Sequence, residues 1–176
     1  MKRFCPILSA LVLLLTSSCK DASTNPGSLT VPRMFFESEY VNYAWGYSHS
    51  GRFIDTSGLV ISYDIARSGD HWEPNRSGYY TEAEIWAKIH HRDTVRGVVP
   101  ADTLELLKSL GLASMVGTYS DTTCPGADMG ALIYSCYVFQ ADSLKFQRIV
   151  LRVEGDCRYH NTSANAIELA AWLARH

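Results

Sequence analysis

Six histidines and a polar loop are the first candidates for chemistry in this sequence. The histidines are His49, His71, His90, His91, His160 and His176. A zinc site needs several such ligands at short, fixed spacings, and the sequence has neither a His-Glu-x-x-His nor a Cys-x-x-Cys motif. We therefore predict no metal site and no cofactor. His90 and His91 stand together at an expected helix end, where a cationic imidazole would interact favourably with the helix dipole.

The densest polar cluster lies between residues 67 and 78. Its members are Asp70, His71, Glu73, Asn75 and Arg76. Loops of this composition can carry binding or catalytic side chains, although most are simply solvated. We take Asp70 and His71 as candidate binding residues. A hydrolase that combines this loop with His49 or His160 is an alternative.

No nucleophile in the sequence has the neighbours that catalysis requires. Cys157 and His160 are three residues apart and could meet on a loop, but no third residue that would orient the imidazole is evident. The segment from Gly46 to Gly51 has the spacing Gly-x-Ser-x-x-Gly, and no strand-to-helix turn follows it, unlike a serine elbow. We assign no catalytic residue.

Aromatic residues form a row near residue 45. Tyr43, Trp45 and Tyr47 alternate with smaller residues and would share one face of an extended strand. Such a row can bind sugar rings or a partner protein. The alternative is that these side chains form the core beneath the helices. Exposure of the three rings would favour binding, whereas histidines and carboxylates converging in one pocket would favour an enzyme.

The first 21 residues indicate export. Lys2 and Arg3 precede an apolar run over residues 7–15, which is about half the ~20 residues that a membrane-spanning helix needs. The run ends in Leu-Thr-Ser-Ser-Cys at Cys19, which resembles the lipobox of bacterial lipoproteins. The resemblance implies cleavage before Cys19, lipidation of its thiol and, with Lys20 next, localisation in the outer membrane, on its periplasmic face or at the cell surface. An ordinary secretory signal that leaves Cys19 as a plain thiol is the alternative.

With Cys5 lost in the signal and Cys19 lipidated, as the resemblance implies, three cysteines stay available for pairing in an oxidising compartment. A hairpin that turns between residues 140 and 145 would bring Cys124 and Cys157 together just past its open end. It would place Cys136 opposite Ile149 in mid-sheet. We predict a disulfide between Cys124 and Cys157 and a buried thiol at Cys136.

The charge balance argues against one class of partner. Of the 16 Lys and Arg residues, two lie in the signal, which leaves 14 against 18 Asp and Glu in the processed chain. An acidic chain lacks the basic face that releases counterions from nucleic acid. We therefore expect no nucleic-acid partner, a membrane contact through lipid on Cys19, and an envelope protein or a glycan as a possible ligand.

Periodicity predicts strands and helices in separate groups. We expect a strand over residues 34–47, a hairpin over 52–65 that turns at Asp55-Thr56-Ser57-Gly58, and a second hairpin over 131–154. Thr81 and Glu84 form a capping box for a helix over residues 82–90 that buries Ile85, Trp86 and Ile89. Leu104, Leu107 and Leu110 mark a helix that Gly111 would end. A last helix, capped by Asn161, Thr162 or Ser163, would run to about residue 174 with Ile167, Ala170, Ala171 and Trp172 inward.

Together these elements predict an α+β fold, with an antiparallel sheet of about four to five strands in two hairpins and about three helices packed mainly on one face. The expected organisation is a signal at residues 1–18, a lipidated cysteine and polar tether at 19–32, and one domain at 33–176. As a whole, the chain is similar to small envelope lipoproteins of Gram-negative bacteria. The function expected is a non-enzymatic binding or accessory domain. The alternatives are the hydrolase and an inhibitor of a secreted protease, which would present a disulfide-braced loop around residues 124–128.

Overall fold

Strand β1 (Met34–Asn42) lies in the middle of an antiparallel sheet whose order is β4-β7-β6-β1-β2-β3-β5, with β8 also paired to β7. The structure is a computed structural model that describes residues 32–90 and 94–176. The expected signal, Cys19 and most of the tether lie outside these residues, as does His91. The other strands are β2 (Ser48–Ile54), β3 (Leu59–Asp64), β4 (Tyr79–Tyr80), β5 (Thr94–Val98), β6 (Ala131–Gln140), β7 (Lys145–Gly155) and β8 (Tyr159–His160).

The α+β class is confirmed, and the predicted sheet was too small. The two expected hairpins, β2–β3 and β6–β7, are both present, and β1 joins them into one sheet of eight strands. Strands β4 and β8 have two residues each, both paired with the long β7. A two-residue strand is too short to show a period of two, so the sequence pattern could not reveal either strand.

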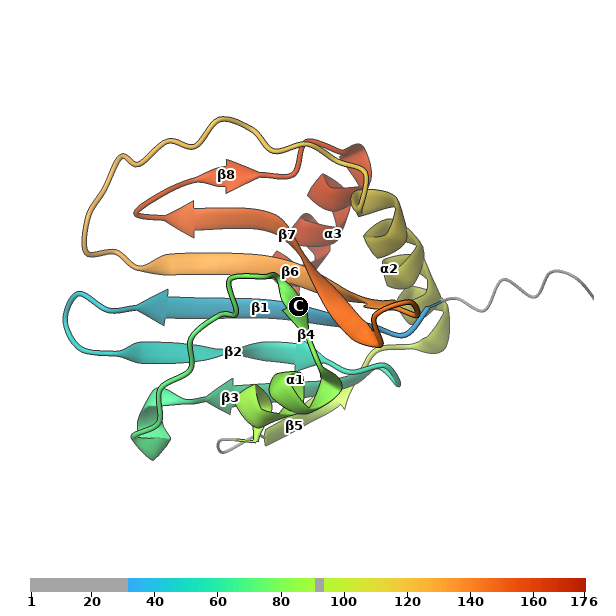
Figure 1. Ribbon diagram of the computed structural model, residues 1–176, viewed down its shortest axis with the longest axis horizontal. Coiled ribbons are helices and arrows are strands. Elements are labelled where there is room, and N and C mark those ends of the chain that lie inside the picture. The colour runs from blue at the N-terminus through green and yellow to red at the C-terminus, as the bar shows by residue number, and fades with distance from the viewer. Residues whose placement is uncertain (1–31, 91–93) are drawn as a thin grey trace, which may run out of the picture. The chain divides into compact units, whose positions relative to one another are not determined.

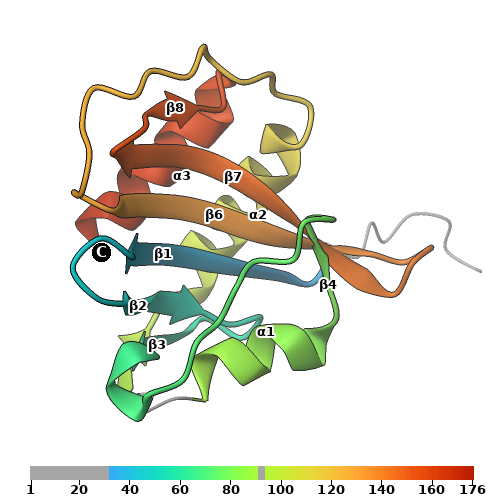
Figure 2. The ribbon, with the colours of Figure 1, turned by 60° about the vertical axis from the view of Figure 1, so that its left-hand side comes forward.

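The two longer helices cover one face of the sheet, and the shortest helix covers part of the other face. They are α1 (Glu82–Ile89), α2 (Ala101–Ser114) and α3 (Ala164–Arg175), with a short 3₁₀ helix, η1 (Ala66–Ser68). Helices α2 and α3 lie behind the sheet and α1 lies in front of it (Figures 1 and 2). Met34 and Phe36 pack in the core under α2 and α3, and Phe35 packs in the core under α1. Because successive side chains of β1 point to opposite faces, two separate cores follow.

The predicted strand over residues 34–47 was too long. Strand β1 ends at Asn42, whose side-chain Oδ1 accepts a hydrogen bond from the amide of Ala44 at 2.8 Å. This is the local turn that asparagine favours, and Gly46 follows with a φ of 105°. Residues 43–47 therefore form the turn between β1 and β2 instead of extending β1.

The predicted starts of two helices are confirmed, whereas the predicted end of α2 and part of the predicted buried face of α3 are wrong. The Thr81–Glu84 capping box is present, and Ser163 caps α3. Gly111 does not end α2, which continues to Ser114. A Cβ on this glycine would stand 2.3 Å from Cε of Met34, so Gly111 permits α2 to approach the sheet closely. Ile167 is 50% exposed, not inward, because α3 turns Leu169 and Leu173 towards the core.

The second hairpin places the cysteines as predicted. Cys136 is buried opposite Ile149, and Cys124 forms a disulfide with Cys157. Burial raises the pKa of the Cys136 thiol to about 12. In the part of the chain that the structure describes, no helix is both long and apolar enough to cross a membrane.

Candidate functional site

A cavity of about 560 Å³ lies on the α1 face of the sheet, at the end where β1 turns into β2. Helix α1 has eight residues and is ~12 Å long, whereas the nine residues of β1 span ~30 Å, so α1 covers only part of this face. The cavity lining is Glu39, Val41, Asn42, Tyr43, Ala44, His49, Trp72, Pro74, Gly130, Ala131, Ile133, Arg148, Val153, Asp156 and Cys157.

Along β1, the side chains on the α1 face change from aromatic to charged and then to aliphatic. Phe35 is in the aromatic core under α1, Glu37 and Glu39 are buried charges, and Val41 lines the cavity. Ile133 on β6 pairs with Glu39 on one side and with Val153 on β7 on the other. These neighbouring strands give the cavity an apolar wall that is continuous with the sheet.

Two buried carboxylates share one buried lysine beside this wall. Nζ of Lys88, on α1, lies 2.8 Å from Oε1 of Glu37 and also donates to Oε2 of Glu39. The hydroxyls of Tyr63 and Tyr137 donate to the two oxygens of Glu37 at 2.5 and 2.6 Å. Lys88, Glu37 and Glu39 are each at least 98% buried, so these contacts replace the water that the charges have lost.

Arg148 and His49 complete the partners of Glu39. Arg148 Nη2 donates to Oε1 of Glu39, and its Nε donates to the Ser135 hydroxyl at 3.0 Å. His49 Nε2 lies 2.8 Å from Oε2 of Glu39. An ionised carboxylate only accepts hydrogen bonds, so His49 carries its proton on Nε2. We refer to Glu37, Glu39, His49, Lys88 and Arg148 as the ion cluster.

Tyr47 links the ion cluster to the loop that precedes β4. Its hydroxyl lies 2.9 Å from Nδ1 of His49 and accepts from the amide of Trp72 at 3.1 Å. The same hydroxyl lies 3.3 Å from the carbonyl oxygen of Trp72. Both ring nitrogens of His49 therefore have a partner within the fold. The two carboxylates of the cluster, Glu37 and Glu39, face two cationic side chains, Lys88 and Arg148.

The pKa values show how strongly the cluster stabilises its ionised form. Burial acts to raise the pKa of Glu39, but the charges of Lys88 and Arg148 and the hydrogen bond from His49 outweigh it and hold this pKa well below its usual range. Burial and the nearby Glu37 raise the pKa of Tyr63 well above its usual value. Glu39 is therefore a carboxylate and Tyr63 a neutral donor at physiological pH.

Aromatic rings close the cavity on the loop side. The ring centroid of Trp72 lies 4.2 Å from Nζ of Lys88, and the ring stacks on Tyr80. At the β1–β2 turn, the ring of Tyr43 contacts those of Tyr47 and His71 at centroid distances of 5.6 and 5.8 Å. Figure 1 shows the loop crossing in front of the sheet between η1 and β4.

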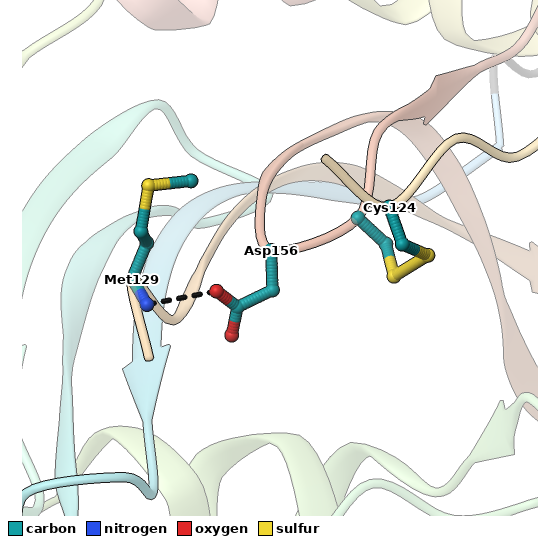
Figure 3. Close-up of a disulfide and its surroundings, with 4 residues drawn as sticks. Cys124, Met129 and Asp156 are labelled. Atoms are coloured by element: carbon teal, nitrogen blue, oxygen red, sulfur yellow. Dashed lines mark hydrogen bonds between the residues drawn. A yellow bond between two sulfur atoms is a disulfide. The ribbon is translucent and has the colours of Figure 1, made fainter. Parts of the chain in front are cut away.

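The disulfide supports the opposite end of the cavity. Asp156 directly precedes Cys157, and its Oδ1 accepts from the amide of Met129 at 2.8 Å (Figure 3). A Cβ on Gly155 would stand 2.0 Å from the carbonyl oxygen of Gly130, so these two segments approach as closely as glycine permits. The Asp156 carboxylate is fixed at the cavity wall by these contacts.

The structure separates the candidate site residues into two groups. Tyr43 lines the cavity, and Tyr47 and His71 pack around it. Trp45 is 82% exposed and is not part of the lining, and Asp70 is exposed on the loop outside it. The core interpretation of the aromatic row is wrong for Tyr43 and Trp45, because the strand ends before them. His160 lines a different surface hollow, beside β8.

The sequence patterns did not predict the ion cluster, although the spacing of two acidic residues in β1 indicated it. Glu37 and Glu39 sit two residues apart in a strand of aromatic and apolar residues, so both point to one face of a central strand. Carboxylates are seldom buried without partners, so this spacing calls for cations from other elements. Lys88 on α1 and Arg148 on β7 supply them. Among the described residues, no group of three or more His, Cys, Asp or Glu side chains is placed to hold a metal ion.

We predict that Lys88→Met destabilises the domain by about 3–5 kcal/mol at neutral pH, because it leaves two carboxylates buried without their shared cation. Urea unfolding followed by tryptophan fluorescence measures this free energy. The matched control is Lys108→Met, which removes the pair with the exposed Glu105 and should cost less than about 1 kcal/mol.

Adding Glu37→Gln to Lys88→Met removes the excess negative charge and should restore part of the lost stability. This second variant also covers the case in which the single variant fails to fold. Equal losses from Lys88→Met and Lys108→Met, or no recovery in the double variant, would contradict the structural role given to the ion cluster.

The chain matches no protein-family model, no curated protein and no solved structure. Its function must therefore be argued from its own geometry. That geometry is an apolar cavity with aromatic side chains on the loop side, a fixed carboxylate at one end and, at its base, an ion cluster whose members are bonded to one another.

Proposed function

We propose that this protein is a binding domain of the bacterial envelope, held at the outer membrane by lipid on Cys19, and that its cavity takes a small ligand with an apolar body. The observation that carries the proposal is the cavity itself. Ligand sites are commonly clefts of ~300–1,000 Å³ with apolar and aromatic walls and a few fixed polar groups. The cavity of about 560 Å³ has this size and this composition.

The rigidity of the walls supports binding. The apolar residues Val41, Ile133 and Val153 belong to central strands, and the disulfide and the Asp156–Met129 hydrogen bond fix the loop end. A preformed site loses little conformational entropy when a ligand enters. The cavity therefore needs no rearrangement of the sheet to be occupied.

His49 lines the cavity together with Glu39 and Asp156, which is the convergence expected of an enzyme, but the bonding of these groups favours binding. Glu39, His49 and Tyr47 form a hydrogen-bonded chain similar in layout to a carboxylate–histidine–nucleophile arrangement, which is the feature that favours the hydrolase alternative. However, the Tyr47 hydroxyl is also bonded to the backbone of Trp72, and burial raises the pKa of Tyr47. A tyrosine with a raised pKa is a poor nucleophile. Hydrolysis of a substrate that His49→Gln abolishes would support the alternative.

The protease-inhibitor alternative has weaker support. The loop around residues 124–128 is braced by the disulfide, as that reading requires. Its end is also held to β1, because Tyr40 donates to the carbonyl of Met129 and Asn42 to that of Asp128. An inhibitory loop must protrude into an active site, and this loop is tied along the sheet.

The tether and the cavity lie at different ends of β1, which is compatible with ligand binding by an anchored domain. The chain enters the domain at the beginning of β1, and the cavity lining begins at Glu39, five residues along the strand and ~17 Å away. A tether that begins at Cys19 would therefore join the domain at the end of β1 that does not line the cavity. A glycan or an envelope protein is the proposed partner for the exposed Trp45 in the turn beside the cavity.

We predict that a neutral apolar dye such as Nile red binds the protein at one saturable site. Replacing Ile133 by Trp fills the cavity and should weaken this binding by about tenfold or more. Fluorescence titration measures both affinities. The control is Val116→Trp, at a position 87% exposed, which adds the same indole to the surface and should leave dye binding unchanged. Equal binding by both variants would place the dye elsewhere and contradict the site.

The anchor is tested separately. Mass spectrometry of the protein extracted from membranes should find acyl chains on Cys19, and Cys19→Ala should move the protein to the soluble fraction, because each buried methylene contributes ~0.8 kcal/mol to membrane binding. Cys5→Ser is the control and should keep the protein in the membrane. An unmodified Cys19, or membrane association that survives Cys19→Ala, would overturn the anchor.

A further inference from the structure

We infer that the cavity selects a small apolar amine in its cationic form over neutral and anionic molecules of the same shape, with the ammonium group near Asp156. This inference rests on the ligand-binding function proposed above and adds the chemical class of the ligand. The cavity lining supplies a carboxylate, aromatic rings and apolar walls.

The two carboxylates of the lining differ in their partners. Two carboxylates, Glu39 and Asp156, and one guanidinium, Arg148, face the cavity. Arg148 is bonded to Glu39, so this pair is neutral. Behind it, Lys88 balances Glu37. Asp156 is the carboxylate that no cationic side chain of the described lining neutralises.

A ligand anion would meet an unfavourable potential. Arg148 is the only guanidinium or ammonium group in the described lining, and the two oxygens of Glu39 already accept from Arg148, Lys88 and His49. A carboxylate that approached Arg148 would face Glu39 at the same time and would have to replace it as the partner of Arg148. Replacement would leave Glu39 with fewer cationic partners in a buried place, which is costly.

The aromatic rings favour a cation as well. Tyr43 and Trp72 both line the cavity, and organic ammonium groups bind at the faces of such rings. Nζ of Lys88 already lies 4.2 Å from the centroid of the Trp72 ring, so the Tyr43 ring is the one that a ligand cation would contact. Burial raises the pKa of Tyr43, and the nearby carboxylates of Glu73 and Glu39 raise it further. A cation is therefore favoured at both the ring side and the Asp156 side of the cavity.

The walls between these groups require an apolar body. Val41, Ala131, Ile133 and Val153 offer no hydrogen-bonding side chain, and the two nitrogens of His49 are already bonded to Glu39 and Tyr47. A sugar would bury hydroxyl groups against these side chains without partners, which costs free energy. A hydrocarbon or an aromatic ring loses nothing there and gains from leaving water.

Three matched probes test the inference: 3-phenylpropylamine, 3-phenylpropanol and 3-phenylpropionate, titrated at neutral pH and low ionic strength by calorimetry. We expect the amine to bind roughly five- to tenfold more tightly than the alcohol, and the carboxylate to bind most weakly. Asp156→Asn keeps the oxygen that accepts from Met129, so the loop stays in place, and it should bring the amine to within about twofold of the alcohol.

The control is Asp142→Asn, an exposed carboxylate in the turn between β6 and β7, which should leave the amine preference unchanged. An alcohol that binds as tightly as the amine, a carboxylate that binds best, or a preference that survives Asp156→Asn would overturn the charge selection while leaving ligand binding intact. Failure of all three probes and of the neutral dye would overturn the proposed function itself.

Discussion

The hydrogen bonds and ion pairs around Glu37 and Glu39 are the constraint on which the α1 face of the sheet depends. Two adjacent inward positions of the central strand β1 carry carboxylates, and burying a charge is tolerable only when ionic and hydrogen-bonding partners replace water. The partners come from every element around them: Lys88 from α1, Arg148 from β7, His49 from β2, and Tyr63 and Tyr137 from β3 and β6. The position of α1 against the sheet is thereby fixed at one point along β1.

The cavity follows from where that network lies. On one side of it, Phe35, Phe53 and Phe146 fill the space under α1, and on the other side α1 has ended. The loop before β4 crosses this uncovered part of the sheet and is held by the Tyr47–Trp72 hydrogen bond, while the disulfide holds the opposite loop. The space between them is left open. Because the carboxylates of the network are paired with its own cations and its hydrogen bonds are internal, it closes the base of the cavity without demanding a charged ligand.

Many secondary-structure elements and the disulfide could be predicted from the sequence, because residues close together in the chain or simple strand pairing determine them. The hairpin turn at residues 55–58, the capping box at Thr81 and the register that joins Cys124 to Cys157 depend on nearby residues or on simple strand pairing. The two-residue strands β4 and β8, the placement of α1 on the front face and the continuation of α2 through Gly111 depend on tertiary packing. No local pattern records those contacts.

The candidate site was predictable only in part for the same reason. The polar loop and the aromatic turn were recognised by composition, and Tyr43 and His71 do lie beside the cavity or its rim. Lys88 looks in sequence like an ordinary polar residue near the end of an amphipathic helix. Its burial becomes evident only when Glu37 and Glu39 are known to face it, 51 and 49 residues away along the chain. A pair of acidic residues spaced by two in a central strand is the signal to look for.

The most direct test of this account is a crystal structure of the protein with 3-phenylpropylamine. We expect the phenyl ring against Val41, Ile133 and Val153, the ammonium group beside Asp156, and the ion cluster unchanged beneath the probe. A cavity filled by the protein's own side chains, or a probe bound only at another surface, would contradict the claim that the cavity is the functional site.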